Sequence, residues 1–227
     1  MRQIALDTET TGLEPALGHR IIEIAGIEII NRRITGKHFH CYLNPDRDID
    51  AGAQNVHGIT AEFLKDKPAF GQTAEAFLAY IKNSELIIHN ANFDVGFLNH
   101  ELALLNPQYD KITAYCKIID TLSIARLRHP GQKNNLDALC KRYNIDNSRR
   151  DLHGALLDAQ LLAQVYLAMT GGQGSLFGDE TQDFYQPQEK KIKNHRRASL
   201  RVIKATAEEE KLHLQRMLEV EEIARHS

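Results

Sequence analysis

Residues 4–13, IALDTETTGL, begin as a short apolar strand and run directly into two acids, Asp7 and Glu9. Side chains two residues apart on a strand point to the same face, so the two carboxylates should lie side by side. Like charges this close repel unless a cation lies between them, and carboxylate oxygens are typical ligands of Mg²⁺ or Mn²⁺. The alternative is that one of these acids begins a turn, because Asp, Thr and Gly are common turn formers.

Two further acids lie in apolar surroundings far along the chain. Asp94 follows residues 86–93, LIIHNANF, a buried-strand pattern that leads into a helical run, so it should lie at a strand-to-helix junction. Asp158 lies within residues 152–163, where the leucine spacing predicts a helix whose inner face normally excludes an acid. A carboxylate there needs a counter-charge. His153 is five residues earlier, about 140° around a helix, so we expect it on the turn before the helix or in its first residues.

These acids, the histidine and their local sequences resemble the three motifs of the DEDD exonuclease superfamily, in its histidine-containing branch. The closest resemblance is to the DnaQ-type proofreading subunits of bacterial DNA polymerase III, and it extends over almost the whole chain through residues 55–60, 135–140 and 200–206. It implies an α/β, ribonuclease H-like fold, with a five-stranded mixed β-sheet flanked by helices and a flexible C-terminal tail.

The resemblance also implies a site for two divalent cations, Mg²⁺ or Mn²⁺, held by Asp7, Glu9, Asp94 and Asp158. His153 would take the proton of the attacking water as general base. The resemblance places the terminal nucleotide of a DNA strand against Asp7, Glu9, Thr10, Leu13, Val56, His57 and Asp158.

Four other polar residues lie near these motifs, and their expected roles differ. For His89, a structural role and a role in lining the site both stay open, and Asp151 stays a candidate because it adjoins the third motif. Asp120 is expected to be a helix N-cap and Asp137 to lie in the first turn of a helix.

The pattern of apolar residues before Thr170 alternates between strand and helix periods. It predicts strands at residues 3–6, 21–30, 34–43 and 86–89, a turn at 31–33, and helices at 70–82, 95–105, 121–128, 135–143 and 152–169.

The composition changes after Thr170, which predicts an exonuclease domain at residues 1–170 and a flexible linker at 171–205. Residues 206–227 are strongly helix-forming, and by resemblance this helix binds the polymerase catalytic subunit. Within the linker, Gln173, Leu176 and Phe177 resemble the pentapeptide by which bacterial replication proteins bind the sliding clamp. The alternative for the pentapeptide is a linker that happens to carry two apolar residues. The alternative for the terminal helix is a solvated tail.

Charge, apolar runs and cysteine content indicate what the protein binds and in which compartment it works. The formal net charge is −2, whereas proteins that hold nucleic acid by electrostatics usually carry a basic excess, so we expect weak intrinsic affinity for DNA and a partner that delivers the strand. The sequence has no apolar run of membrane-spanning length and no signal peptide, which predicts a cytoplasmic protein without membrane contact. Cys41, Cys116 and Cys140 are expected to be reduced and to behave as small hydrophobic residues.

Two alternative functions stay open. An RNA-trimming exonuclease of the same superfamily would use the same metal chemistry, although the clamp-like peptide and the tail argue against it. A non-catalytic scaffold that bridges polymerase and clamp would be expected to have lost some of the acids, and all four acids and His153 are present. The sequence leaves open whether a further small core subunit binds.

Overall fold

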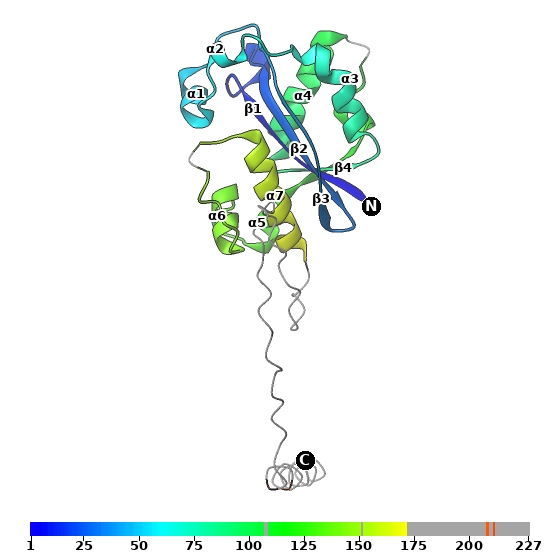
Figure 1. The fold of residues 1–227 in the computed structure, drawn as a ribbon, viewed down its shortest axis with the longest axis vertical. Helices are drawn as coiled ribbons and strands as arrows, with labels where there is room; N and C mark the ends of the chain where they lie inside the picture. The colour runs from blue at the N-terminus through cyan, green and yellow to red at the C-terminus, as the bar shows by residue number, and fades with distance from the viewer. Residues whose placement is uncertain (107–108, 151, 172–207, 209–210, 212–227) are drawn as a thin grey trace, which may run out of the picture. The chain divides into compact units, whose positions relative to one another are not determined.

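The computed structural model describes residues 1–106, 109–150 and 152–171, together with Glu208 and Lys211 (Figure 1). Asp151 and the clamp-like residues Gln173, Leu176 and Phe177 lie outside the described residues. All of the proposed linker except Gly171, and all but two residues of the proposed terminal helix, lie outside them as well.

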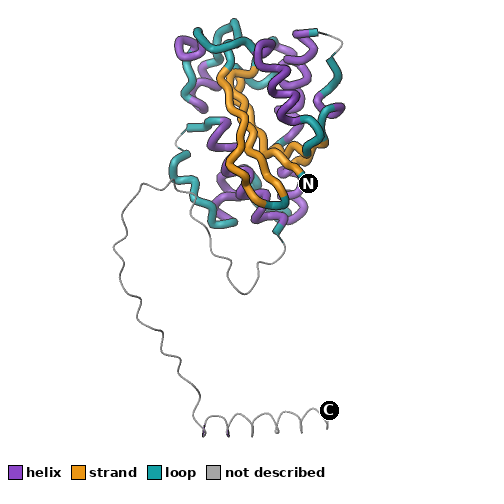
Figure 2. Tube along the Cα trace, turned by 45° about the vertical axis from the view of Figure 1, so that its right-hand side comes forward, coloured by secondary structure: helices purple, strands orange, loops and turns teal. Residues whose placement is uncertain are grey.

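A mixed sheet of five strands forms the centre of the described fold (Figure 2). Its order is β3-β2-β1-β4-β5; β2 runs antiparallel to both β1 and β3, whereas β4 lies parallel to β1 and to β5. This is the predicted ribonuclease H-like sheet. The strands are β1 (Arg2–Thr10), β2 (Ile21–Ile30), β3 (Arg33–Tyr42), β4 (Glu85–Ile88) and β5 (Lys117–Asp120).

The β2–β3 hairpin closes at Asn31 and Arg32, within the turn expected from the sequence. Both residues have positive φ angles, 49° and 64°. Two consecutive left-handed residues match the right-handed twist of a hairpin, and asparagine tolerates this conformation better than most residues.

Helices cover both faces of the sheet (Figures 1 and 2). The helices α3 and α4 pack on one face, and α5, α6 and α7 on the other. The α-helices are α1 (Ala51–His57), α2 (Ala61–Leu64), α3 (Phe70–Ile81), α4 (Ala91–Leu105), α5 (Thr121–Arg128), α6 (Leu136–Arg142) and α7 (Ala155–Thr170).

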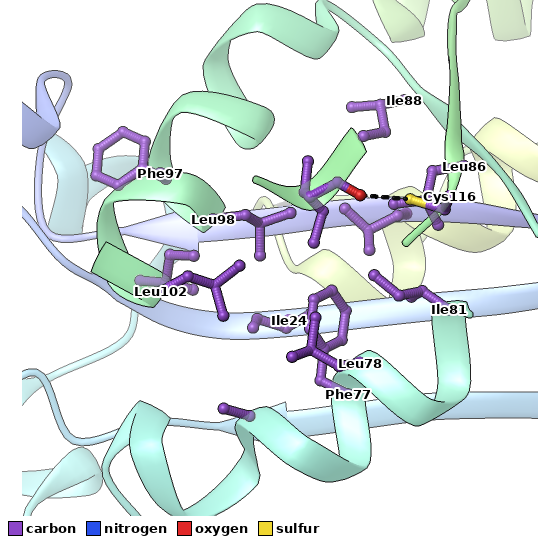
Figure 3. Packing of buried hydrophobic residues seen from close by; sticks show 14 of the residues in the cluster. Ile24, Phe77, Leu78, Ile81, Leu86, Ile88, Phe97, Leu98, Leu102 and Cys116 are labelled. Carbon is purple, nitrogen blue, oxygen red and sulfur yellow. Dashed lines mark hydrogen bonds between the residues drawn. The ribbon is translucent and has the colours of Figure 1, made fainter. Parts of the chain in front are cut away.

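The core under α3 and α4 is built from large apolar side chains (Figure 3). Phe77 of α3 and Phe97 of α4 are almost completely buried, and each contributes about 1.5–3 kcal/mol by its removal from water. Cys116 packs in the same core, and its thiol donates a hydrogen bond to the carbonyl oxygen of Ile112.

The core under α7 is built from small residues where the helix crosses the sheet. Ala155, Ala159 and Ala163 lie on one side of α7, and all three are fully buried. They pack in one cluster with Ala5 of β1 and Ala25 of β2. Because none of these side chains extends beyond Cβ, α7 can lie close to the strands, and its first turn is brought next to the end of β1.

Two predicted helix starts differ from the structure in ways that affect the site. The helix predicted to begin at residue 95 begins at Ala91, so Asp94 lies in its first turn instead of before it. The helix predicted from residue 152 begins at Ala155, which leaves His153 on the preceding turn. The helices α1 and α2 and the strand β5, each seven residues or fewer, were not predicted.

The three cysteines are free, as expected. Cys116 and Cys140 are buried and Cys41 is half-buried. Burial raises the pKa of all three thiols to about 11, which keeps them protonated near neutral pH. None of the helices in the described part of the chain is long and apolar enough to cross a membrane.

Candidate active site

A cavity of about 940 Å³ lies where the carboxyl ends of β1 and β4 meet α4 and α7. The five residues predicted to be catalytic or metal-binding all line it: Asp7, Glu9, Asp94, His153 and Asp158. They come from four segments up to 151 residues apart in sequence, so the fold assembles this cluster.

The strand β1 directs its acids toward α7. Ala5 packs under that helix, and Asp7 and Glu9 follow at intervals of two, so they share its face. Thr8 points to the opposite face, where its hydroxyl donates a 2.7 Å hydrogen bond to Oδ1 of Asp94 in the first turn of α4. Asp158 lies in the first turn of α7 and is buried.

The carboxylates are crowded and poorly solvated. Burial, with repulsion from Asp94, Glu9 and Asp158, raises the pKa of Asp7 well above its ordinary value. Burial, with repulsion from Asp158 and other acids, raises the pKa of Glu9 to about 8. Burial also raises the pKa of Asp94 to about 7, although the hydrogen bond from Thr8 opposes the shift. The cavity therefore has a deficit of positive charge, which a divalent cation would relieve.

The donor set fits such a cation. Glu9, His153 and Asp158 each offer a ligand atom, and these atoms lie within 4.8 Å of one another. Carboxylate oxygens with at most one imidazole suit Mg²⁺ or Mn²⁺. His153 is 45% exposed, and its Nδ1 lies 3.7 Å from Oδ2 of Asp158, so it can act either as a ligand or as a base beside the metal.

The counter-charge that Asp158 requires is Arg150, a residue that the sequence analysis missed. Its guanidinium donates two hydrogen bonds of 2.6 Å to the two carboxylate oxygens of Asp158 and one of 2.7 Å to Asp137. The sequence held a signal for it, because Arg150 lies three residues before His153 on the same turn. Nothing in the sequence distinguished it from the adjacent Arg149.

Glu23 is a second residue that the sequence analysis missed. It lies on β2 directly opposite Glu9 and is buried. Its Oε2 accepts a 3.1 Å hydrogen bond from the backbone N–H of Ala155, the first residue of α7, and its Oε1 lies 2.8 Å from Nε2 of His40. Glu23 therefore fixes the start of the helix that carries Asp158. An acid inside the apolar strand at residues 21–30 was the available signal.

Replacing Glu23 by alanine should lower both stability and activity. The N–H of Ala155 would lose its acceptor, at a cost of about 1–3 kcal/mol. The start of α7 would shift, with an activity loss of about 10- to 100-fold. Glu23→Gln is the matched control, because its amide oxygen can still accept from Ala155 and its NH₂ can donate to neutral His40. Melting temperatures and single-turnover rates test this; equal losses in both variants would mean that the charge of Glu23 matters and not its position.

The remaining predicted substrate residues do not line this cavity. The hydroxyl of buried Thr10 donates to the carbonyl oxygen of Gly12, and Leu13 is 79% exposed. Val56 is half exposed, and its carbonyl oxygen accepts a 3.0 Å hydrogen bond from the N–H of His153, which ties α1 to the site. His57 is buried and its Nδ1 accepts from the N–H of Ile59. Their contact with a nucleotide stays a prediction.

The other polar residues have structural partners. His89 lines the cavity, with its Nδ1 2.9 Å from the hydroxyl of Thr121, and burial lowers its pKa. Asp120 is the N-cap of α5, as predicted. Asp137 lies in the first turn of α6, as predicted, and it also pairs with Arg150.

A five-stranded mixed sheet that gathers four acids and a histidine in one cavity defines an exonuclease of the ribonuclease H-like class. A family model described as "Exonuclease" matches residues 4–166, and the chain belongs to this family. Exonucleases of this family use divalent metal ions.

Relatives match over nearly the whole chain. The DNA polymerase III subunit epsilon of Escherichia coli (strain K12) is 52% identical over 223 residues, which cover 95% of this chain and 92% of that protein. The protein of the same name from Rickettsia typhi (strain ATCC VR-144 / Wilmington) is 59% identical over 177 residues, 78% of this chain and 77% of that protein.

Solved structures agree on the fold. Exonuclease X in complex with 5′ overhanging duplex DNA is 28% identical, with a TM-score of 0.58 over 74% of this chain and 90% of that chain. The nuclease domain of 3'hExo, a DEDDh family member bound to rAMP, gives a TM-score of 0.63 with the same coverage and 18% identity.

Proposed function

We propose that this chain is the proofreading 3′–5′ exonuclease subunit of a bacterial DNA polymerase III. It removes mismatched 3′-terminal nucleotides from DNA as 5′-mononucleotides. The proposal is carried by one observation: Asp7, Glu9, Asp94, His153 and Asp158 line the same cavity. The full-length similarity to DNA polymerase III epsilon subunits supports the substrate and the setting.

Asp7, Glu9, Asp94 and Asp158 hold two divalent cations, Mg²⁺ or Mn²⁺. Such ions supply the positive charge that activates water and stabilises the departing 3′ oxygen. The chain's own residues arrange the rest: Thr8 orients Asp94 through its hydroxyl, and the short, small-residue contact of α7 with β1 holds Asp158 beside Asp7.

His153 takes the proton from the attacking water. Its imidazole lines the cavity and is half exposed, and its backbone N–H donates a hydrogen bond to the carbonyl oxygen of Val56. A neutral imidazole has one ring nitrogen with a free lone pair, which can accept a proton from water. No side chain needs to become covalently attached to the nucleotide.

Preference for mismatched ends requires no reading of the bases. An unpaired 3′ terminus costs less to melt from its duplex and to thread into a single-strand site than a paired one. Thr10, Leu13, Val56 and His57 are the residues that we propose to contact the terminal nucleotide.

Mass analysis of reaction products tests this function. A 3′-mismatched DNA primer with Mg²⁺ should release 5′-mononucleotides faster than a matched primer, and chelator should stop the reaction. Equal or faster trimming of matched RNA would favour the RNA-trimming alternative. Absence of products from every substrate would favour the non-catalytic scaffold.

The segments proposed to bind partners lie outside the described fold. We propose that residues 206–227 bind the DNA polymerase III catalytic subunit and that Gln173, Leu176 and Phe177 bind the sliding clamp. A further small core subunit is also a possible partner. The net charge of −2 supports delivery of the strand by a partner. Chromosome replication places the protein in the bacterial cytoplasm.

Removing residues 171–227 should leave digestion of free single-stranded primers about unchanged but abolish joining of polymerase and clamp. In the full chain, the double substitution Leu176→Ala and Phe177→Ala should weaken clamp binding alone, because two buried apolar anchors commonly dominate a short-peptide interface. Pull-downs of clamp and of polymerase subunit by each variant measure this. Undiminished clamp binding by the double variant would show that the peptide is not the anchor.

A further inference from the structure

The cavity already contains a cation of the chain's own. The side chain of Arg150 is only 6% exposed, although it lies on the segment between α6 and α7. Its guanidinium contacts both carboxylate oxygens of Asp158 at 2.6 Å, one oxygen of Asp137 at 2.7 Å, and Nδ1 of His153 at 3.2 Å. It therefore contacts two of the five residues on which the proposed chemistry depends.

Each of these contacts has a defined direction. Arginine keeps its proton under all ordinary conditions and has no acceptor, so Nδ1 of His153 must be the acceptor. The lone pair on Nδ1 is then engaged by Arg150 and is not available for the proton of a water molecule. The same guanidinium forms a bidentate pair with Asp158, the strongest common geometry for an arginine and a carboxylate.

A divalent cation on Asp158 would lie close to this guanidinium. The two positive charges would repel each other in a cavity that is partly shielded from water. Arg150 has a second partner, Asp137, whose side chain is 52% exposed, so the guanidinium can leave Asp158 without losing every negative neighbour.

We propose that Arg150 and the divalent cation compete for Asp158. Arg150 is a built-in counter-ion that holds Asp158 and His153 in place, and metal binding moves its guanidinium away from both toward Asp137. Metal loading thereby releases Nδ1 of His153 and couples the availability of the base to the presence of the metal. This inference rests on the proposed function.

The test compares two variants of the full chain by titration with Mn²⁺, followed by electron paramagnetic resonance. Arg150→Gln should bind Mn²⁺ about tenfold more tightly than the unmodified chain, the equivalent of losing one competing charge-assisted contact. Arg126→Gln is the matched control: Arg126 lines the same cavity, and its substitution removes the same charge. Its Mn²⁺ affinity should change much less.

A second readout is the melting temperature. In chelator, Arg150→Gln should melt at a lower temperature than the unmodified chain, because Asp158 loses its partner. Saturating Mn²⁺ should make the difference in melting temperature between the two chains smaller, because the metal then neutralises Asp158 in both. If Arg150→Gln does not fold, Arg150→Lys keeps the charge but not the bidentate geometry and should still bind Mn²⁺ more tightly.

Three results would overturn the inference: unchanged Mn²⁺ affinity in Arg150→Gln, weaker affinity, or an equal gain in Arg126→Gln. Each can occur while the unmodified chain binds Mn²⁺ and digests primers. The proposed function fails separately, if the unmodified chain does neither.

Discussion

Asp7→Ala should abolish hydrolysis while the chain stays folded. Asp7 on β1 lines the cavity near Glu9 and Asp94, and its carboxylate is one of four that would share the metal ions. Removal of a shared ligand disrupts a two-metal site as a whole. Primer digestion measures the loss, and Asp66→Ala, at an exposed acid that does not line the cavity, is the control that should keep full activity. Full activity in Asp7→Ala would contradict the metal assignment.

A substitution of Asp7 should also change how the stability of the folded chain depends on pH. The folded-state pKa of Asp7 is raised well above its unfolded value near 4, so the folded chain binds this proton more tightly than the unfolded chain does. In chelator, the group then costs stability progressively as pH rises through the interval between the two values. Asp7→Asn removes that cost, so its gain in melting temperature should be larger at pH 8 than at pH 5. A gain independent of pH would argue that Asp7 is not buried as an acid.

His153→Ala should lower the hydrolysis rate by about 10²- to 10⁴-fold, the usual worth of a positioned base. Mn²⁺ affinity should change little. Single-turnover rates at saturating Mn²⁺, with Mn²⁺ titrations of the same protein, separate the two roles. Loss of Mn²⁺ binding in His153→Ala would reassign His153 as a ligand, a role that its closeness to Glu9 and Asp158 would permit.

Local sequence was sufficient to predict the helices and strands whose apolar residues recur with a clear period. The strand β2 and the helix α5 have the predicted boundaries, and α3 differs by one residue. The acids Asp7 and Glu9 could be placed on one face because strand geometry fixes the side of every second residue. The placement of Asp94 and Asp158 beside them agrees with the expectation from the motifs.

The residues missed were those whose role depends on tertiary contacts. Glu23 contacts a backbone N–H 132 residues away, and no local pattern reports such a pair. Arg150 differs from its neighbour Arg149 in sequence by position alone, and the fold decides which one reaches Asp158. The start of α4 was predicted too late because the polar residues that follow the strand were assigned to the end of its pattern, and the helical run was predicted to begin at residue 95. In the structure Asn90 has a left-handed conformation, with φ of 69°, and the helix begins directly after it.

The central claim is that the carboxylates of Asp7, Glu9, Asp94 and Asp158 hold the metal ions of a nuclease. Anomalous diffraction from crystals grown with Mn²⁺ and a 5′-mononucleotide tests it most directly. The account predicts two anomalous peaks in the cavity, both ligated by the set Asp7, Glu9, Asp94 and Asp158 and in contact with the nucleotide phosphate. A bound nucleotide with no anomalous peak among these carboxylates would contradict it.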